Sequence, residues 1–144
     1  MAVDEHIAAL VPHAGTMCLL ERIEHWDDTS VTVATATHRD PANPLASRSG
    51  LRAIALCEYG AQAMAVHGGL TAKARGERAH PGLLVSLREV TFDCDFVQEL
   101  DGELLVEARR LNENDTAWQY EFRVTHAGKL LAQGRATVSV ASRA

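Results

Sequence analysis

The sequence lacks the features that mark several large classes of protein. Of its 144 residues only two are lysine and 5% are aromatic, and the formal net charge is −5. No basic stripe of the kind that binds nucleic acid is visible. No apolar run approaches the roughly 20 residues that a membrane-spanning helix needs, and the first ten residues lack the basic and apolar regions of a secretion signal. We therefore expect a cytoplasmic protein that binds neither nucleic acid nor a membrane.

Motifs for metals and nucleotides are lacking as well. The three cysteines show no CxxC and no Cys/His ligand spacing, so we expect them to pack as small apolar side chains. They are Cys18, Cys57 and Cys94. An odd number of cysteines is typical of a reducing compartment. The sequence contains no HExxH motif, no GxGxxG, no P-loop and no GxSxG elbow. We expect no metal ion and no cofactor.

What the sequence does contain is a succession of strand-like runs with one helix among them. The predicted strands are 17–26, 31–36, 83–96, 104–111, 118–125 and 130–142. Leu51–His67 is predicted to be a helix, because it lacks proline, is rich in Ala, Leu and Met, and precedes Gly68-Gly69. An irregular loop covers 39–50. This order, with short connections, predicts a single α+β domain over residues 1–144, an antiparallel sheet around one central helix.

The predicted helix carries polar residues within its apolar stripe. The stripe consists of Leu51, Ile54, Ala55, Glu58, Ala61, Gln62 and Ala65. A buried carboxylate is costly unless it is paired or used, and buried carboxyl groups are suited to proton transfer near neutral pH. Glu58 is therefore a candidate catalytic residue. The alternative is that Glu58 lies at the edge of the stripe, in water or hydrogen-bonded to a neighbouring loop.

Segments spread over residues 10–140 resemble the hot-dog fold dehydratases that act on 3-hydroxyacyl-acyl carrier protein. EYGAQ (58–62) is similar to the E-A-x-A-Q-like context of that family's catalytic Glu, and LVPHAGTMCLLERIEHWD (10–27) is similar to its opening strand. LLVSLREVTFDCDF, LDGELLVEA and LLAQGRATVSV resemble its later sheet segments. The closest resemblance is to the dehydratase-like proteins of aryl-polyene clusters, which share the PHAG, NPL, GL and EYGAQAMAVHGG elements. The resemblance implies a hot-dog fold, a dimer, acyl thioester substrates and acyl carrier protein as partner.

One departure separates the sequence from the ordinary dehydratases. They place a catalytic His fourteen residues before the Glu, in G-H-F-P-G-x-P-x-x-P-G-V, and the corresponding residue here is Pro44. His38 and His13 are candidate replacements. In the resembling enzymes the Glu faces a His of the opposite subunit. The resemblance therefore implies either a homodimer or a heterodimer with a second dehydratase-like subunit that supplies the His.

Other candidate site residues lie before and along the helix. Gly50 is expected at the helix start, where it would let the backbone approach a ligand and leave N–H groups free for a thioester oxygen. The further candidate substrate-binding residues are Asn43, Leu45, Leu51 and Gln62. His67 is expected to be a cation that caps the helix C-terminus.

The leading hypothesis is therefore dehydration of 3-hydroxyacyl thioesters to trans-2-enoyl thioesters, in fatty-acid-like or aryl-polyene synthesis. One alternative is a hot-dog acyl-thioester hydrolase, in which a helix carboxylate activates water. The other is a non-catalytic partner subunit that docks the carrier protein. The product, an enoyl thioester or a free acid and thiol, distinguishes the two enzymes.

Overall fold

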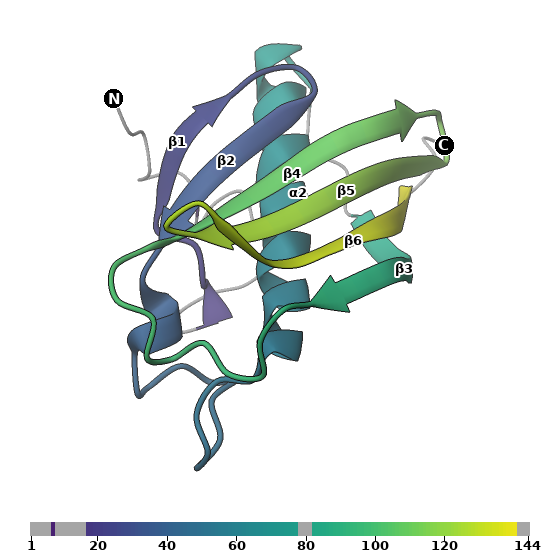
Figure 1. Ribbon diagram of the computed structural model, residues 1–144. Coiled ribbons are helices and arrows are strands. Elements are labelled where there is room, and N and C mark those ends of the chain that lie inside the picture. Colours follow the sequence, from purple (N-terminus) through teal and green to yellow (C-terminus); the bar gives the residue numbers. More distant parts are fainter. Residues whose placement is uncertain (1–6, 8–16, 78–81, 141–144) are drawn as a thin grey trace.

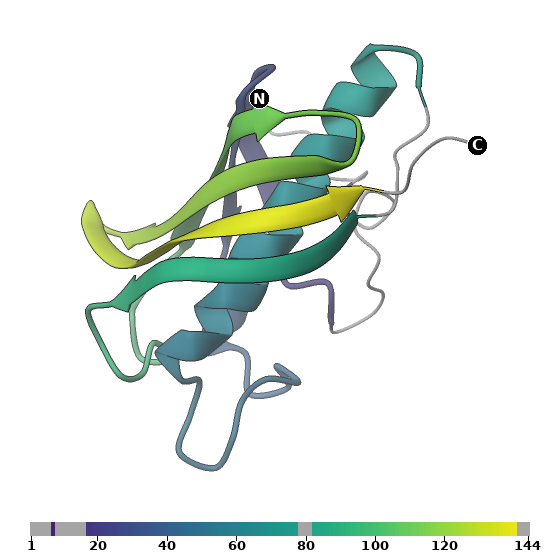
Figure 2. The same ribbon diagram turned by 90° about the vertical axis from the view of Figure 1, so that its right-hand side faces the viewer.

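One antiparallel sheet with a long helix against it makes up the structure (Figures 1 and 2). The computed structural model describes residues 7, 17–77 and 82–140. The elements are β1 (Arg22–Trp26), β2 (Ser30–Thr35), the 3₁₀ helices η2 (Thr37–Arg39) and η3 (Ala53–Ala55), α2 (Leu56–Ala74), β3 (Gly82–Phe92), β4 (Leu104–Glu113), β5 (Ala117–His126) and β6 (Lys129–Val140). The strands follow the order β1-β2-β4-β5-β6-β3 in the sheet. This confirms the predicted α+β hot-dog arrangement.

Helix α2 crosses one face of the sheet and contacts β2, β4, β5 and β6 (Figure 1). Leu56, Tyr59 and Val66 of the helix are fully buried in the core that the helix forms with the strands. The helix approaches the sheet closely at Gly60, where a Cβ would lie 2.6 Å from the ring of Phe122 on β5. A glycine at this position lets the sheet curve tightly around the helix.

The helix begins and ends later than predicted. It starts at Leu56, preceded by η3, and it continues through Gly68 and Gly69 to Ala74. Gly68 is buried, and a Cβ there would lie 3.0 Å from the Trp118 ring, so this glycine serves packing within the helix. Gly76 follows two residues after the end of the helix, and its φ of +71° is of the kind that ends many helices.

The predicted apolar stripe matches the buried side of the helix only in part, since Leu51 and Gln62 are buried but its other members are not. Ile54 is 65% exposed, and Glu58, Ala61 and Ala65 are only half-buried, whereas the side facing the sheet contains residues such as Tyr59. Small residues stand on all sides of this helix, so their spacing does not distinguish the faces. Glu58 lies at the edge of the buried face, as the alternative interpretation expected.

Strand β3 is an edge of the sheet and pairs within the chain with β6. Several of its apolar side chains are exposed, most of all Val85 at 60%. The others are Leu84, Leu87 and Phe92. An apolar edge strand of this kind is a site for association with another chain. Among the described helices, none is long and apolar enough to cross a membrane.

Candidate functional site

Glu58 lies on α2 with Gln62 one turn further along. Gln62 Nε2 donates to Glu58 Oε2 at 3.3 Å and to the carbonyl oxygen of Met17 at 2.6 Å. Gln62 Oε1 accepts the Leu19 N–H at 2.9 Å. Because a backbone N–H can only donate, this contact sets the orientation of the amide group. Gln62 therefore directs an N–H at the Glu58 carboxylate and ties the segment before β1 to the helix.

Tyr59, the next residue on α2, organises the loop that follows η2. Its hydroxyl lies 2.8 Å from Thr37 Oγ1 and 2.9 Å from Asn43 Nδ2. Asn43 also donates to the carbonyl oxygen of Thr37 and accepts the Leu45 N–H. All polar atoms of the buried Asn43 side chain therefore have partners within the chain, as those of Gln62 do. Leu45 packs against the edge of the core.

The corner at Gly50 and Leu51 differs from the expectation of free N–H groups. The Gly50 N–H donates to the carbonyl oxygen of Ser47 at 3.0 Å, and the Leu51 N–H donates to Gln98 Oε1 at 2.9 Å. Gly50 has a φ of +115°, and a Cβ there would lie 2.2 Å from the Gln98 side chain. Glycine is required here so that Gln98 can cover the backbone. Helical structure, moreover, begins with η3 at Ala53 and not at Gly50.

The candidate histidines occupy separate places. His13 lies outside the described residues. His38, on η2, is 1% exposed, and its Nε2 lies 2.8 Å from the carbonyl oxygen of Leu100. Burial lowers its pKa, which favours the neutral ring. The hydrogen bond of His38 therefore joins its ring to residues 93–103, the connection between β3 and β4, and not to Glu58.

The prediction that His67 is a capping cation is wrong. The ring is fully buried in the middle of α2, with Nδ1 at 2.8 Å from the Tyr120 hydroxyl and Nε2 at 3.1 Å from the carbonyl oxygen of Asp27. Burial, and then the charge of Arg110, lowers its pKa. The ring is therefore neutral, because the sheet excludes water from it. The helix extends two turns beyond His67, so this residue does not lie at the helix C-terminus.

An open cleft of about 460 Å³ lies between η3 and the end of β3. Its lining residues are Arg52, Ala53, Ile54, Phe92, Asp93, Cys94 and Asp95. Ile54 of η3 precedes Glu58 of α2 by four residues. The Arg52 guanidinium lies 5.0 Å from the centre of the Phe96 ring beside the cleft. No sequence signal marks the cleft, because its walls come from two segments about 40 residues apart.

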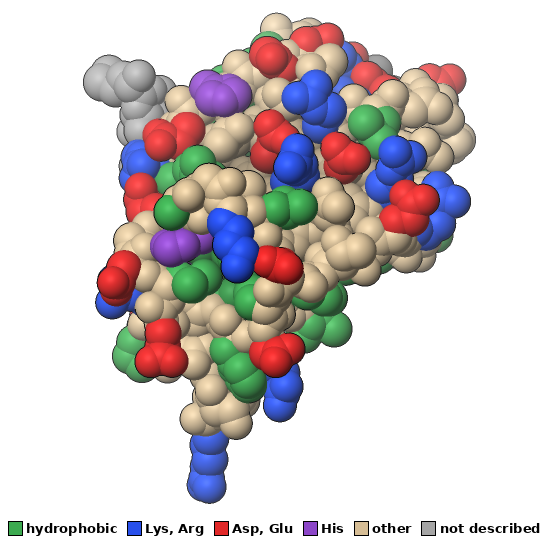
Figure 3. Space-filling model, in the orientation of Figure 1, with side chains coloured by type: hydrophobic (Ala, Val, Ile, Leu, Met, Phe, Trp, Pro, Cys, Tyr) green, Lys and Arg blue, Asp and Glu red, His purple; other side chains and the backbone are tan. Residues whose placement is uncertain are grey.

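The charges on the outer face of the sheet are mixed in sign (Figure 3). Figure 3 shows basic and acidic side chains interspersed over the face that the sheet presents. Within the described ranges no group of three or more His, Cys, Asp or Glu residues could hold a metal ion.

Comparisons with known proteins show the family and the fold of the chain. A family model described as ApeP-like, ApeP dehydratase, matches residues 5–144. The chain belongs to the ApeP-like dehydratase family. A search of curated protein sequences finds no significant match.

Solved structures of similar fold include a dehydratase complex and several thioesterases. The ApeP-like chain is 25% identical to a chain of the dehydratase heterocomplex ApeI:P from Xenorhabdus doucetiae, with 95% of this chain and 91% of that chain covered and a TM-score of 0.83. It is 17% identical to a mutant thioesterase from Pseudomonas aeruginosa (83% and 79% covered, TM-score 0.62). It is 18% identical to zebra fish thioesterase superfamily member 2 (96% and 95% covered, TM-score 0.65). The two thioesterases share the hot-dog fold with this ApeP-like chain.

Proposed function

We propose that this chain is one subunit of a 3-hydroxyacyl-acyl carrier protein dehydratase, with Glu58 as its catalytic residue. The placement of Glu58 carries the proposal. Glu58 is half-buried on α2 and accepts an N–H from Gln62. It comes about one helical turn after Ile54, which lines the cleft. Membership of the dehydratase family supports the reaction class. The cleft beside Ile54 and Phe92 would receive the acyl thioester.

The reaction converts a 3-hydroxyacyl thioester into a trans-2-enoyl thioester and water. A base removes the proton from the carbon next to the thioester carbonyl, the carbon–carbon double bond forms, and the carbon–oxygen bond to the hydroxyl breaks. An acid protonates the departing hydroxyl so that it leaves as water. Glu58 would carry one of these protons. The second proton carrier is expected to be a histidine, as in the resembling enzymes.

Two observations favour a partner subunit as the source of that histidine. Pro44 stands where the ordinary dehydratases have theirs. In addition, the rings of His38 and His67 are buried and bound to Leu100 and Tyr120. The apolar edge strand β3 offers a place for a second subunit to continue the sheet. The similarity to a chain of the ApeI:P heterocomplex supports a heterodimer.

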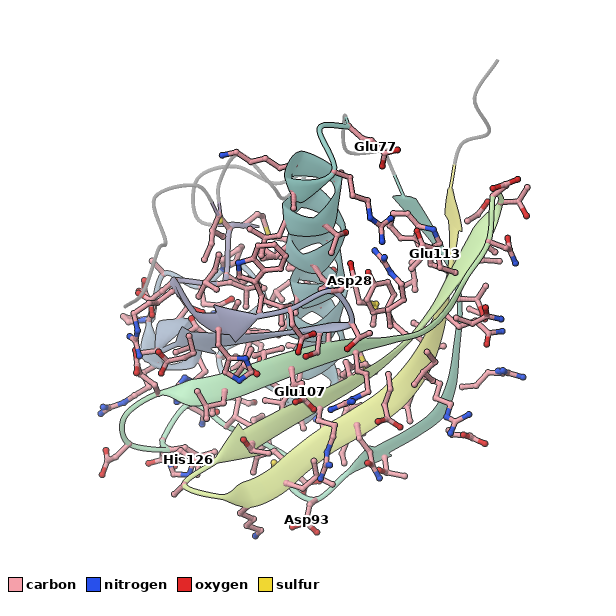
Figure 4. All side chains as sticks on the ribbon, turned by 90° about the horizontal axis from the view of Figure 1, so that it is seen from above. Asp28, Glu77, Asp93, Glu107, Glu113 and His126 are labelled. Atoms are coloured by element: carbon pink, nitrogen blue, oxygen red, sulfur yellow. The ribbon has the colours of Figure 1, made fainter. Side chains whose placement is uncertain are left out.

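Mass spectrometry of a 3-hydroxyacyl-carrier protein substrate tests the proposal. The chain is incubated with the substrate alone and together with the second dehydratase-like subunit. We expect enoyl thioester from the pair and far less from this chain alone. Glu58→Ala in this chain should abolish turnover while the complex remains folded. Glu107→Ala, on the outer face of β4 (Figure 4), is the matched control and should leave turnover unchanged.

The other outcomes identify the alternatives. Release of free acid and thiol would show a thioester hydrolase, which the fold shared with thioesterases makes the second candidate. Full turnover by a pair that carries Glu58→Ala would show that this chain is a non-catalytic partner. Full turnover by the purified chain alone would rule out the heterodimer.

A further inference from the structure

The connection between β3 and β4 borders the start of α2. The Ala53 N–H donates to the carbonyl oxygen of Asp95 at 2.8 Å, and the Val97 N–H donates to that of Leu51 at 2.9 Å. The same connection supplies Asp93, Cys94 and Asp95 to the cleft. Its conformation therefore determines the shape of the cleft wall and the position of the backbone that leads into the helix.

Two histidines from different elements hold the end of this connection, the Leu100–Asp101 turn. His38 Nε2 lies 2.8 Å from the carbonyl oxygen of Leu100, and His126 Nε2 lies 2.6 Å from that of Asp101. A carbonyl oxygen only accepts, so both rings carry their hydrogen on Nε2. Figure 4 shows His126 at the end of β5. Arg39, next to His38, pairs with the Asp101 carboxylate at 3.3 Å.

The contact at His38 continues to the start of the helix through the backbone. The Leu100 N–H donates to the carbonyl oxygen of Val97 at 3.1 Å, and Val97 in turn donates to Leu51. A chain of three hydrogen bonds thus joins the His38 ring to Leu51. Val97 and Leu51 are fully buried, so this chain is shielded from water.

The burial of His38 argues against direct chemistry by its ring. The side chain is 1% exposed in the isolated chain, and association with a partner can only bury it further. Its Nδ1 atom is buried and has no hydrogen-bond partner among the described residues. A substrate in the open cleft therefore has no path to Nδ1 in this conformation, although Nδ1 holds the free electron pair of the neutral ring.

We propose that His38 and His126 are positioning residues that hold the Leu100–Asp101 turn, and with it the cleft wall, against the start of α2. They act through the donated Nε2–H and not through proton transfer to the substrate. The expected effect on turnover rests on the proposed dehydration. The expected effect on the turn does not.

Substitution by glutamine separates the two roles of His38. Glutamine places an N–H donor close to the position of histidine Nε2 and does not titrate, so it can replace a positioning residue but not a base. In the full chain with its partner, His38→Gln should keep turnover within about threefold of the original, whereas His38→Ala should lower it by about tenfold or more. His25→Gln, on the exposed side of β1, is the control and should change nothing.

Hydrogen exchange of the backbone amides gives a readout that needs no activity. His38→Ala and His126→Ala should each speed exchange of the Val97 and Leu100 amides by about tenfold, while the two glutamine variants should retain most of the protection. A His38→Gln variant with normal exchange and no turnover would make His38 a catalytic base and overturn the proposal. Unchanged exchange in both alanine variants would overturn it too. If the unsubstituted complex shows no dehydration, the proposed function fails, and exchange alone decides the role of the histidines.

Discussion

The imidazole of His67 and the hydroxyl of Tyr120 form a buried hydrogen bond of 2.8 Å between α2 and β5. His67 Nε2 donates to the carbonyl oxygen of Asp27, so Nδ1 of the neutral ring must accept, and Tyr120 must be the donor. Tyr120 in turn accepts from Arg110 Nε at 3.1 Å. These directed hydrogen bonds connect β4, β5, α2 and the β1–β2 turn. Nearby, Arg75 pairs with the carboxylates labelled Asp28 and Glu113 beside α2 (Figure 4).

Tyr120→Phe tests the contribution of this network to stability. The change removes one hydroxyl and leaves a buried ring nitrogen of His67 and the Nε–H of Arg110 without their partner. We expect the free energy of unfolding to fall by about 1–3 kcal/mol. Urea denaturation measures the change, and Gln119→Ala, on the exposed side of the same strand, should stay within about 0.5 kcal/mol. A loss as small as that of the control would show that the network does not stabilise the fold.

The stability of the chain should fall as the pH is lowered from 8 to 5.5. Burial lowers the pKa of His67 and of His38 in the folded chain, so the unfolded chain binds protons more readily, from a pKa of about 6.5 downwards. The stabilisation is therefore present above about pH 6.5 and is lost as the pH falls toward the folded pKa values. Urea unfolding at several pH values measures the slope. His67→Asn should have a shallower slope, and an equal slope would contradict the assignment to His67.

Alanine at the two helix glycines should have different effects. At Gly60 the added Cβ would lie 2.6 Å from the Phe122 ring, which is fully buried, so we expect a loss of about 1–3 kcal/mol from overpacking. At Gly68 it would lie 3.0 Å from Trp118, which is half-buried and can shift. The gain in helix propensity, about 1 kcal/mol, should offset much of that strain. Thermal unfolding compares the two variants, and equal losses would contradict this account.

Gln62→Glu tests whether Gln62 orients Glu58. The new carboxylate can still accept from the Leu19 N–H, but it cannot donate to Met17 or to Glu58, and it places a like charge beside Glu58. We expect turnover of the complex to fall by about tenfold or more, and stability to fall by about 1–3 kcal/mol. Gln119→Glu adds the same charge on the exposed face of β5 as a control. Turnover equal to that of the control would remove Gln62 from the site.

The order of the elements and the location of Glu58 on the helix were predictable from the sequence. The strand periodicity, the proline-free segment and the turn residues are local signals, and local hydrogen bonding and side-chain alternation determine those elements. The irregular path of residues 39–50 follows in the same way from its prolines and glycine. The position of Glu58 in the predicted stripe and the resemblance of EYGAQ to a family motif made Glu58 a candidate without any knowledge of its surroundings.

Packing between segments distant in the sequence determined where the helix ends, which side chains are buried and which hydrogen-bond partners they have. The helix continues past Gly68, which packs against Trp118, fifty residues later in the chain. His67 is neutral because Tyr120 and the sheet enclose it. Gln98 accepts the Leu51 N–H across a separation of 47 residues. None of these partners shows in the spacing of residues along the helix, because the spacing fixes which residues share a face and not what that face meets. Burial and hydrogen-bond partners therefore depend on how the sheet wraps around α2, which only the tertiary structure determines.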